Sequence, residues 1–145
     1  MGNMCRSPMA QRVATKLAQD AGLARQLQFD SAGTHSQYVR EHPDPRATAV
    51  LLARHYPVAK SRPRQLIEKD FRRYDWILAM DRNNLRELKR LCPPEYAHKV
   101  RLFLEGATGI DVDEVPDPYY GNLAGFERVL DLCEAGVRDL IQTLR

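Results

Sequence analysis

Segments with the pattern of short buried strands alternate with segments that have the pattern of amphipathic helices along this chain. Helices are predicted at 8–21, 44–55, 82–91 and from 123 onward, and strands at 28–31, 75–79 and 100–104. Such alternation is typical of parallel strands joined by crossover helices. The order predicts an α/β fold with a doubly wound parallel sheet, whose functional loops gather at the carboxyl ends of the strands.

The last predicted helix carries the clearest periodic pattern. Its apolar residues recur at helical spacing on one face. They are Phe126, Val129, Leu130, Cys133, Val137 and Leu140. We expect this stripe to face the core.

The chain opens with a loop pattern that leads into the first helix, which Gly22 should end. Ser7 is a favourable N-cap, and Pro8 suits the first helical position. Gly2 allows the backbone to approach a ligand closely, and Arg6 offers a planar fork that matches phosphate oxygens. Alone, these residues would be an ordinary helix cap and a solvated charge. Together, an arginine and amides at a helix N-terminus predict a cradle for a dianion.

A second motif lies near the far end of the chain. Asp117 stands between two prolines and is followed by Tyr119 and Tyr120. The prolines restrict the backbone, as a positioned general acid requires, and the aromatic rings can wall an aromatic substrate. Alone, the aspartate would be a turn residue and the tyrosines surface packing.

Together the two motifs resemble the low-molecular-weight protein tyrosine phosphatases. That family has a Cys-x5-Arg-Ser loop, usually Cys-x-Gly-Asn-x-Cys-Arg-Ser-Pro, and a distant Asp-Pro-Tyr-Tyr-Gly loop. Further matching segments lie at 29–34, 43–47, 64–66 and 77–81. The resemblance spans the 145 residues and implies one phosphatase-like domain over residues 1–145.

The resemblance implies hydrolysis of phosphotyrosine through a phosphocysteine, without a cofactor. Arg6 would hold equatorial phosphate oxygens, and Asp117 would protonate the leaving phenol oxygen and then activate water. Ser7 would hydrogen-bond the thiolate, and Asn3, Ser7 and Ser31 would brace the strained loop. The residues expected to contact the substrate are Gly2, Asn3, Met4, Cys5, Ser7, Gln37, Tyr38, Tyr119 and Tyr120. Gln37 and Tyr38 stand where many bacterial relatives have Trp-His, so substrate preference could differ.

One departure from the family pattern concerns the nucleophile. Counting back from Arg6 by the family spacing places the nucleophilic cysteine one position before Met1. Cys5 matches the second loop cysteine, which the family links to reversible oxidation rather than attack. We therefore expect the 145 residues to lack both the nucleophile and the first central strand, and to be inactive. A start assigned at an internal methionine is the favoured explanation, and genuine loss of catalysis is the alternative.

The expected lack of a strand has an energetic consequence. A five-residue central strand buries aliphatic side chains worth roughly 8–15 kcal/mol. Whole domains are stable by only about 5–15 kcal/mol. A chain without this strand should be marginal unless something fills the gap, and unusual association becomes possible.

Two other functions fit parts of the pattern. A pseudophosphatase would use Arg6 and a partial loop to bind phosphate or phosphotyrosine without turnover. A thiol-coupled arsenate reductase would need further cysteines for a disulfide relay, and only Cys92 and Cys133 are available. The Asp117 loop suits a phenol leaving group better, so the reductase is the weaker alternative.

Net charge and cysteine content limit the other classes of function that the chain could have. The net charge is only +3 with both signs interspersed, which gives no case for nucleic-acid or membrane binding. Three cysteines without metal-type spacing fit a reducing cytoplasm, and no metal is expected. The expected partners are a phosphotyrosine protein or small aryl phosphate and inorganic phosphate. In bacterial relatives the substrate is often a tyrosine kinase of exopolysaccharide export.

Overall fold

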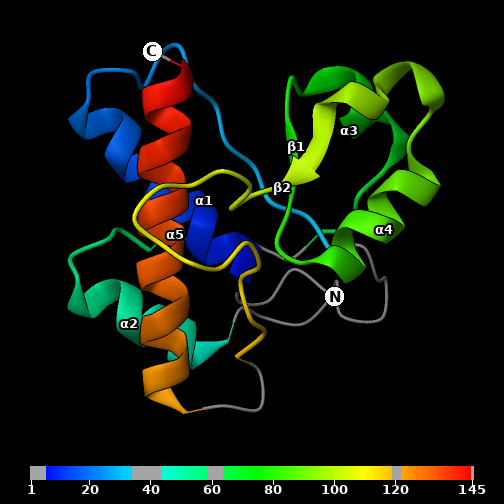
Figure 1. Cartoon of the computed structure of the whole chain (residues 1–145). Coiled ribbons are helices and arrows are strands. Elements are labelled where there is room, and N and C mark those ends of the chain that lie inside the picture. The colour runs from blue at the N-terminus through cyan, green and yellow to red at the C-terminus, as the bar shows by residue number, and fades with distance from the viewer. Residues whose placement is uncertain (1–5, 34–43, 59–63, 119–121, 145) are drawn as a thin grey trace.

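The elements follow the predicted alternation. The computed structural model describes residues 6–33, 44–58, 64–118 and 122–144. Its elements are α1 (Arg6–Asp20), α2 (Pro45–Ala53), α3 (Glu68–Arg73), β1 (Ile77–Ala79), α4 (Arg82–Leu91), the 3-10 helix η2 (Pro94–Lys99), β2 (Val100–Leu102) and α5 (Leu123–Leu144). The two strands pair in parallel, with Ile77 opposite Val100 (Figure 1). Gly33 and Gln65 add an isolated parallel bridge. The parallel α/β fold is therefore confirmed.

The helices α1, α2 and α5 form what we call the helix half, on the left of Figure 1. Both α1 and α2 pack against α5. Met9 and Val13 of α1 and Phe126, Val129 and Leu130 of α5 are completely buried. The predicted stripe on α5 therefore faces the core, although Leu140 is only half-buried.

The remaining elements, α3, β1, α4, η2 and β2, form the sheet half, on the right of Figure 1. Helix α4 packs on both strands. The small core of this half consists of Phe71, Ile77, Ala79, Leu88, Val100 and Leu102. Asp81 follows β1 and caps α4, because its Oδ1 accepts a hydrogen bond of 2.8 Å from the Asn84 amide.

The two halves meet where the strands end. Met80 follows β1, and Phe103 and Leu104 follow β2, yet all three belong to the core of the helix half. A Cβ at Gly136 of α5 would lie 2.7 Å from Phe103 and 2.8 Å from Leu104. Glycine is therefore required for α5 to come this close to the end of the sheet.

Two local predictions are wrong. Residues 28–31 form no strand. Two of their backbone groups are bound by side chains instead: Phe29 O accepts from Gln11 Nε2 at 3.2 Å, and the Ser31 amide donates to Asp30 Oδ1 at 2.8 Å. Helix α1 includes Arg6, so Ser7 lies in its first turn rather than at its cap. Pro8 is tolerated there, since the first-turn amides lack intrahelical partners anyway.

The other boundaries agree more closely. Helix α4 has the predicted bounds, Gly22 ends the first helix with φ +75°, and α2 begins after its Asp44 cap. The sequence predicted neither α3 nor η2. No helix in the described part of the chain is both long and apolar enough to cross a membrane.

Candidate active site

Arg6, the first described residue of α1, connects three segments. Its side chain is only 6% exposed. Nη1 donates to Asp81 Oδ2 at 2.6 Å and to the carbonyl of Val115 at 2.8 Å, and Nη2 donates to Asn84 Oδ1 at 3.4 Å. These contacts hold the guanidinium beside the N-terminus of α1, the carboxyl end of β1 and the loop that precedes α5. A fixed cation at a helix N-terminus suits an anionic substrate.

Asp81 is the carboxylate that orients this arginine. It lies directly after β1, and its two oxygens are divided between the Asn84 amide and Arg6. Burial alone would raise the pKa of Asp81, but the hydrogen bonds from Asn84 and Arg6 outweigh it and hold the pKa below its ordinary value of 3.8. Asp81 is therefore ionised near neutral pH and keeps Arg6 in one orientation.

The loop that carries Asp117 is attached to the same place. Val115 is completely buried, and its amide donates to the Met80 carbonyl at 2.8 Å while its own carbonyl accepts from Arg6. Asp117 follows two residues later and is exposed. The segment that leads to Asp117 is thereby attached at the carboxyl end of β1, on the side where Arg6 lies.

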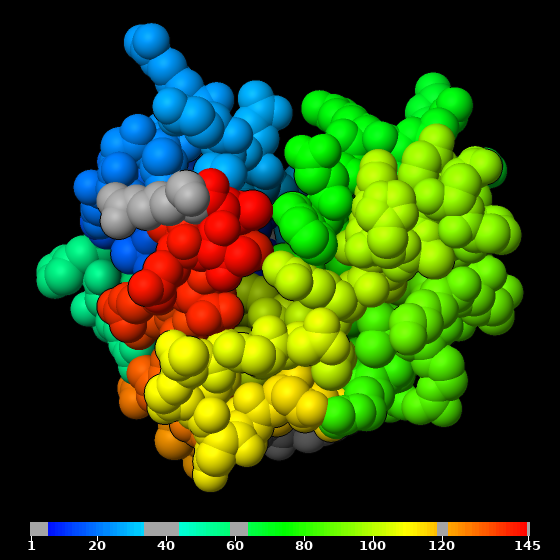
Figure 2. Space-filling view, turned by 45° about the horizontal axis from the view of Figure 1, so that its top comes forward, coloured from blue at the N-terminus to red at the C-terminus, as the bar shows by residue number. Residues whose placement is uncertain are grey.

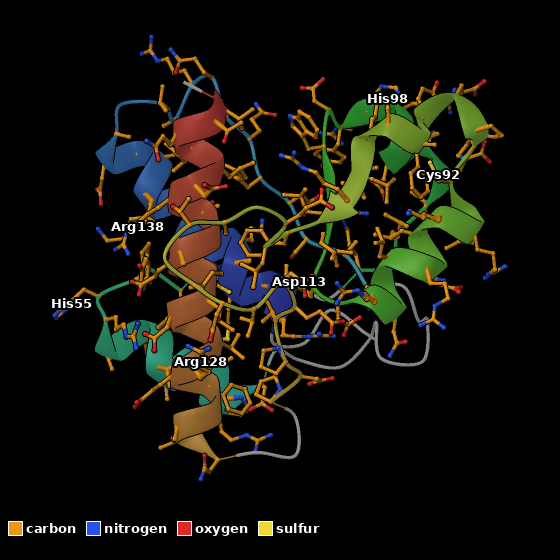
Figure 3. All side chains as sticks on the ribbon, in the orientation of Figure 1. His55, Cys92, His98, Asp113, Arg128 and Arg138 are labelled. Atoms are coloured by element: carbon orange, nitrogen blue, oxygen red, sulfur yellow. The ribbon has the colours of Figure 1, made fainter. Side chains whose placement is uncertain are left out.

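Charged contacts on the surface hold the preceding part of this loop. The amide of Arg82 donates to Glu114 Oε2 at 2.7 Å, and its Nη1 donates to Asp113 Oδ1 at 3.0 Å. Figure 3 shows Asp113 between the two halves, near the start of α1. The loop is therefore held at Asp113 and Glu114 as well as at its buried Val115.

Ser31 is joined to α1 through the side chain of Gln11. Its hydroxyl donates to Gln11 Oε1 at 2.7 Å, and Gln11 in turn bonds Phe29. This joins residues 29–31 to α1. A bracing role of Ser31 toward the phosphate loop stays a prediction.

Several of the predicted site residues lie outside the described residues. They are Gly2, Asn3, Met4, Cys5, Gln37, Tyr38, Tyr119 and Tyr120. Their roles stay predictions. Of the predicted residues that the structure describes, it brings Arg6, Ser7 and the Asp117 loop together.

The two described cysteines lie apart from this site. Cys133 is completely buried in the core of the helix half, whereas Cys92 packs against the core of the sheet half. Burial raises the pKa of the Cys92 thiol. Figure 3 shows Cys92 and His98 on the side of the sheet half away from Asp113. A relay that uses both cysteines, as an arsenate reductase needs, finds no support here.

The roles of Asp81, Asn84 and the Val115 carbonyl were not predicted from the sequence. One signal was available for Asp81, which directly follows a predicted parallel strand, where functional side chains gather. No local pattern marks a backbone carbonyl such as that of Val115. The described residues contain no group of three His, Cys, Asp or Glu side chains that could hold a metal ion.

Comparisons with known proteins agree with this geometry. The family model of the low molecular weight phosphotyrosine protein phosphatases matches residues 1–145. The low molecular weight protein-tyrosine-phosphatase of Streptomyces coelicolor is 43% identical over 99% of this chain and 89% of its own. Two solved structures are similar to the chain. The protein tyrosine phosphatase of Entamoeba histolytica, with Hepes in its active site, has a TM-score of 0.94 and 41% identity, over 99% of this chain and 92% of its own.

The second is the tyrosine phosphatase Wzb of Escherichia coli K30, in complex with sulphate. It has a TM-score of 0.85 and 27% identity, over 100% of this chain and 94% of its own. Arg6 lies at the start of α1, the loop that carries Asp117 is attached beside it, and the family model matches residues 1–145. The chain therefore belongs to the low molecular weight phosphotyrosine protein phosphatase family.

Proposed function

We propose that this site hydrolyses aryl phosphates, phosphotyrosine in proteins above all, with Arg6 as the phosphate-binding cation and Asp117 as the general acid. The hydrogen bond of 2.8 Å from Arg6 to the Val115 carbonyl carries the proposal. It fixes the acid loop to the arginine, so that one phosphate ester can meet both. The N-terminal amides of α1 would add to the binding of the anion.

The chemistry needs a thiolate at the position before Met1, by the family spacing. Its sulfur would attack phosphorus, forming the S–P bond as the P–O bond to the phenol breaks. Asp117 would give its proton to the departing phenolate oxygen. Water, deprotonated by Asp117, would then attack phosphorus, breaking the S–P bond and releasing inorganic phosphate and the thiolate. Arg6 would stabilise the charge on the equatorial oxygens in both steps.

We infer in addition that a polypeptide of these 145 residues does not complete this reaction alone. Its three cysteines are Cys5, Cys92 and Cys133, and none stands at the family position of the nucleophile. Arg6 and the helix N-terminus are present nonetheless. A polypeptide of this kind would bind phosphate without turning it over, which is the behaviour of a pseudophosphatase.

A bacterial tyrosine kinase is the protein substrate that we propose. The similarity to Wzb, a tyrosine phosphatase solved with sulphate, supports a site for a tetrahedral oxyanion. The natural substrate would be a phosphotyrosine on the kinase itself. A direct check is release of phosphate from an autophosphorylated bacterial tyrosine kinase.

The role of Asp117 is tested by its dependence on the leaving group. In a longer polypeptide with an apolar strand and cysteine before Met1, Asp117→Asn should slow phenyl phosphate hydrolysis by about 10²–10⁴-fold. The loss should be much smaller with p-nitrophenyl phosphate, because p-nitrophenolate leaves without a proton. The matched control is Asp111→Asn, an exposed carboxylate in the same loop, which should change neither rate. Equal losses on both substrates would remove Asp117 as the acid.

A further inference from the structure

The outward side of α4 carries charges of a single sign. The helix buries Leu88 and packs Leu85 against the core of the sheet half. Its exposed basic residues recur at positions i, i+4, i+7 and i+8, a spacing that places side chains on one helix face. They are Arg82, Arg86, Lys89 and Arg90, which we call the basic face. Glu87, the one acidic residue of α4, lies outside this spacing and accepts from Arg90 Nε at 3.1 Å.

The basic face begins at the candidate active site. Asp81 caps α4 and Asn84 lies in its first turn, and both accept hydrogen bonds from Arg6. With a rise of about 1.5 Å per residue, Arg86 and Lys89 lie about 3 Å and about 8 Å further along the helix axis than Asn84. Figure 1 shows α4 running from the boundary between the halves toward the right of the view. A peptide whose phosphate is bound at Arg6 would therefore be able to lie along this face.

The end of the basic face nearest Arg6 is electrically balanced. Arg82 binds the carboxylates of Asp113 and Glu114, which precede Asp117 in its loop. Glu114 also accepts from the amide of Arg82 at 2.7 Å, at the N-terminus of α4, where negative charge is favourable. The two carboxylates are thus neutralised at the start of the helix. An acidic ligand would be attracted further along α4.

Two positive charges further along the helix have no carboxylate partner. Within the described part of the chain, no ion pair includes Arg86 or Lys89, and both side chains are exposed. Arg86 donates to an uncharged oxygen, Asn83 Oδ1, at 2.9 Å. The exposed charges of α5, in contrast, include both signs, as in Glu127, Arg128, Asp131 and Arg138. The basic face is therefore suited to an acidic partner.

We propose that the basic face of α4 binds acidic residues of the substrate, so that phosphotyrosine peptides with glutamate or aspartate near the phosphotyrosine are preferred. This inference rests on the proposed function, because it requires the phosphotyrosine to lie at Arg6. An extended peptide spans about 3.3 Å per residue, so acidic side chains within about four residues of the phosphotyrosine would reach Arg86 and Lys89. Charge complementarity of this kind gives specificity and faster association, and salt weakens it.

The test uses labelled peptides and the 145-residue polypeptide. One peptide has two glutamates on each side of a phosphotyrosine, and a second has glutamines in their place. Fluorescence anisotropy at low ionic strength should show about fivefold tighter binding of the glutamate peptide. In about 1 M salt, where charges are screened beyond about 3 Å, the two affinities should become nearly equal. Equal affinities at low ionic strength would overturn the inference.

Three double variants locate the preference on the protein. Arg86→Gln with Lys89→Gln should remove most of the preference for glutamate and leave the affinity for the glutamine peptide unchanged. Arg86→Lys with Lys89→Arg keeps both charges and should keep the preference. The matched control, Arg128→Gln with Arg138→Gln, removes the same charge from α5, which lies to the left of the green residues of the sheet half in Figure 2 and carries both labels in Figure 3. An equal loss in this control would assign the preference to net charge and overturn the inference.

Two further ligands separate this inference from the proposed function. Inorganic phosphate should displace both phosphopeptides, and the glutamate peptide without its phosphoryl group should bind at least about tenfold more weakly. Displacement by phosphate without a preference for glutamate would overturn the inference and support the proposed binding of phosphate. Equal binding of the glutamate peptide with and without its phosphoryl group would contradict both, because the basic face would then bind anions independently of the site.

Turnover gives a second measurement, in the longer polypeptide that carries a cysteine before Met1. Arg86→Gln with Lys89→Gln should lower kcat/KM for the glutamate peptide about fivefold and leave kcat/KM for p-nitrophenyl phosphate unchanged. Equal losses on both substrates would indicate damage to the active site and overturn the inference. This measurement decides the matter if the 145-residue polypeptide binds neither phosphopeptide.

Discussion

The helix half and the sheet half bury their side chains in different ways. In the helix half, α5 packs against two other helices, and residues such as Val129 and Leu130 are surrounded on all sides. In the sheet half, a three-residue strand pairs with one neighbour, and its core is much smaller. A cavity lined by residues of both halves, residues 76–80 among them, lies between the two. The helix half thus buries its core between long helices, whereas the sheet half buries a few side chains around two short strands.

An ion pair and a close backbone approach hold the boundary between the two halves. Arg6 and Asp81 connect the two halves beside the candidate active site, and Gly136 lets α5 approach the end of β2. Stability and chemistry therefore depend on the same boundary. Changes within each half and at the boundary should have effects of different sizes.

Truncation of one phenylalanine to alanine in each core tests this difference in packing most strongly. Phe126→Ala in the helix half should lower the free energy of unfolding by about 3–5 kcal/mol, because the surrounding side chains cannot close the void. Phe71→Ala should cost less, toward about 3 kcal/mol, since the smaller core beside the cavity can relax. Urea unfolding followed by circular dichroism measures both. A larger loss for Phe71→Ala would break the comparison between the halves.

Loss of the Arg6–Asp81 ion pair at the boundary should have the next largest effect on the free energy of unfolding. Asp81→Asn keeps an oxygen to cap α4 but leaves the buried Arg6 without its carboxylate, so it should cost about 2–3 kcal/mol at neutral pH. The folded pKa of Asp81 is lowered, so its contribution is present above its unfolded pKa and is lost as pH falls through the folded value. The difference in free energy of unfolding between wild type and variant should therefore begin to narrow below about pH 4 and continue to narrow as the pH falls further. A gap that does not narrow as the pH falls below about 4 would show that charge is not the cause.

The smallest effects are expected from two glycines of α5. Gly136→Ala should destabilise by about 1–3 kcal/mol, because the added Cβ would lie within 3 Å of the packed Phe103 and Leu104. Gly125→Ala is the matched control, since its Cβ would meet only Pro118, at 3.8 Å. It should be neutral or slightly stabilising, through better helix propensity. Equal destabilisation by both would remove the close approach as the reason for glycine at 136.

The longer helices could be predicted more fully than the short elements of the chain. The periodic stripe of α5 is a local signal, and α2, α4 and α5 lie where the sequence placed them. Residues 28–31 have a strand-like composition, but a strand also needs a neighbour to pair with, and side chains bind their polar groups instead. The single turn and a half of α3 is too short for a periodic signal.

In the candidate site, too, local features could be predicted from the sequence and long-range contacts could not. Arg6 and Asp117 stand in recognisable local motifs, so their chemistry could be predicted from sequence. Their connection could not, because Arg6 is 75 residues from Asp81 and 109 residues from Val115. Contacts over such distances along the chain depend on the parallel pairing of strands, which no single motif encodes.

The central claim is that the phosphate-binding groups are present in these 145 residues and that the nucleophile is not. The most direct test compares p-nitrophenyl phosphate hydrolysis by the purified 145-residue polypeptide and by the same polypeptide preceded by a short apolar run ending in cysteine. We predict phosphate binding without turnover for the first and turnover for the second. Turnover by the 145-residue polypeptide alone would contradict the account, because it would place a competent nucleophile among the residues already present.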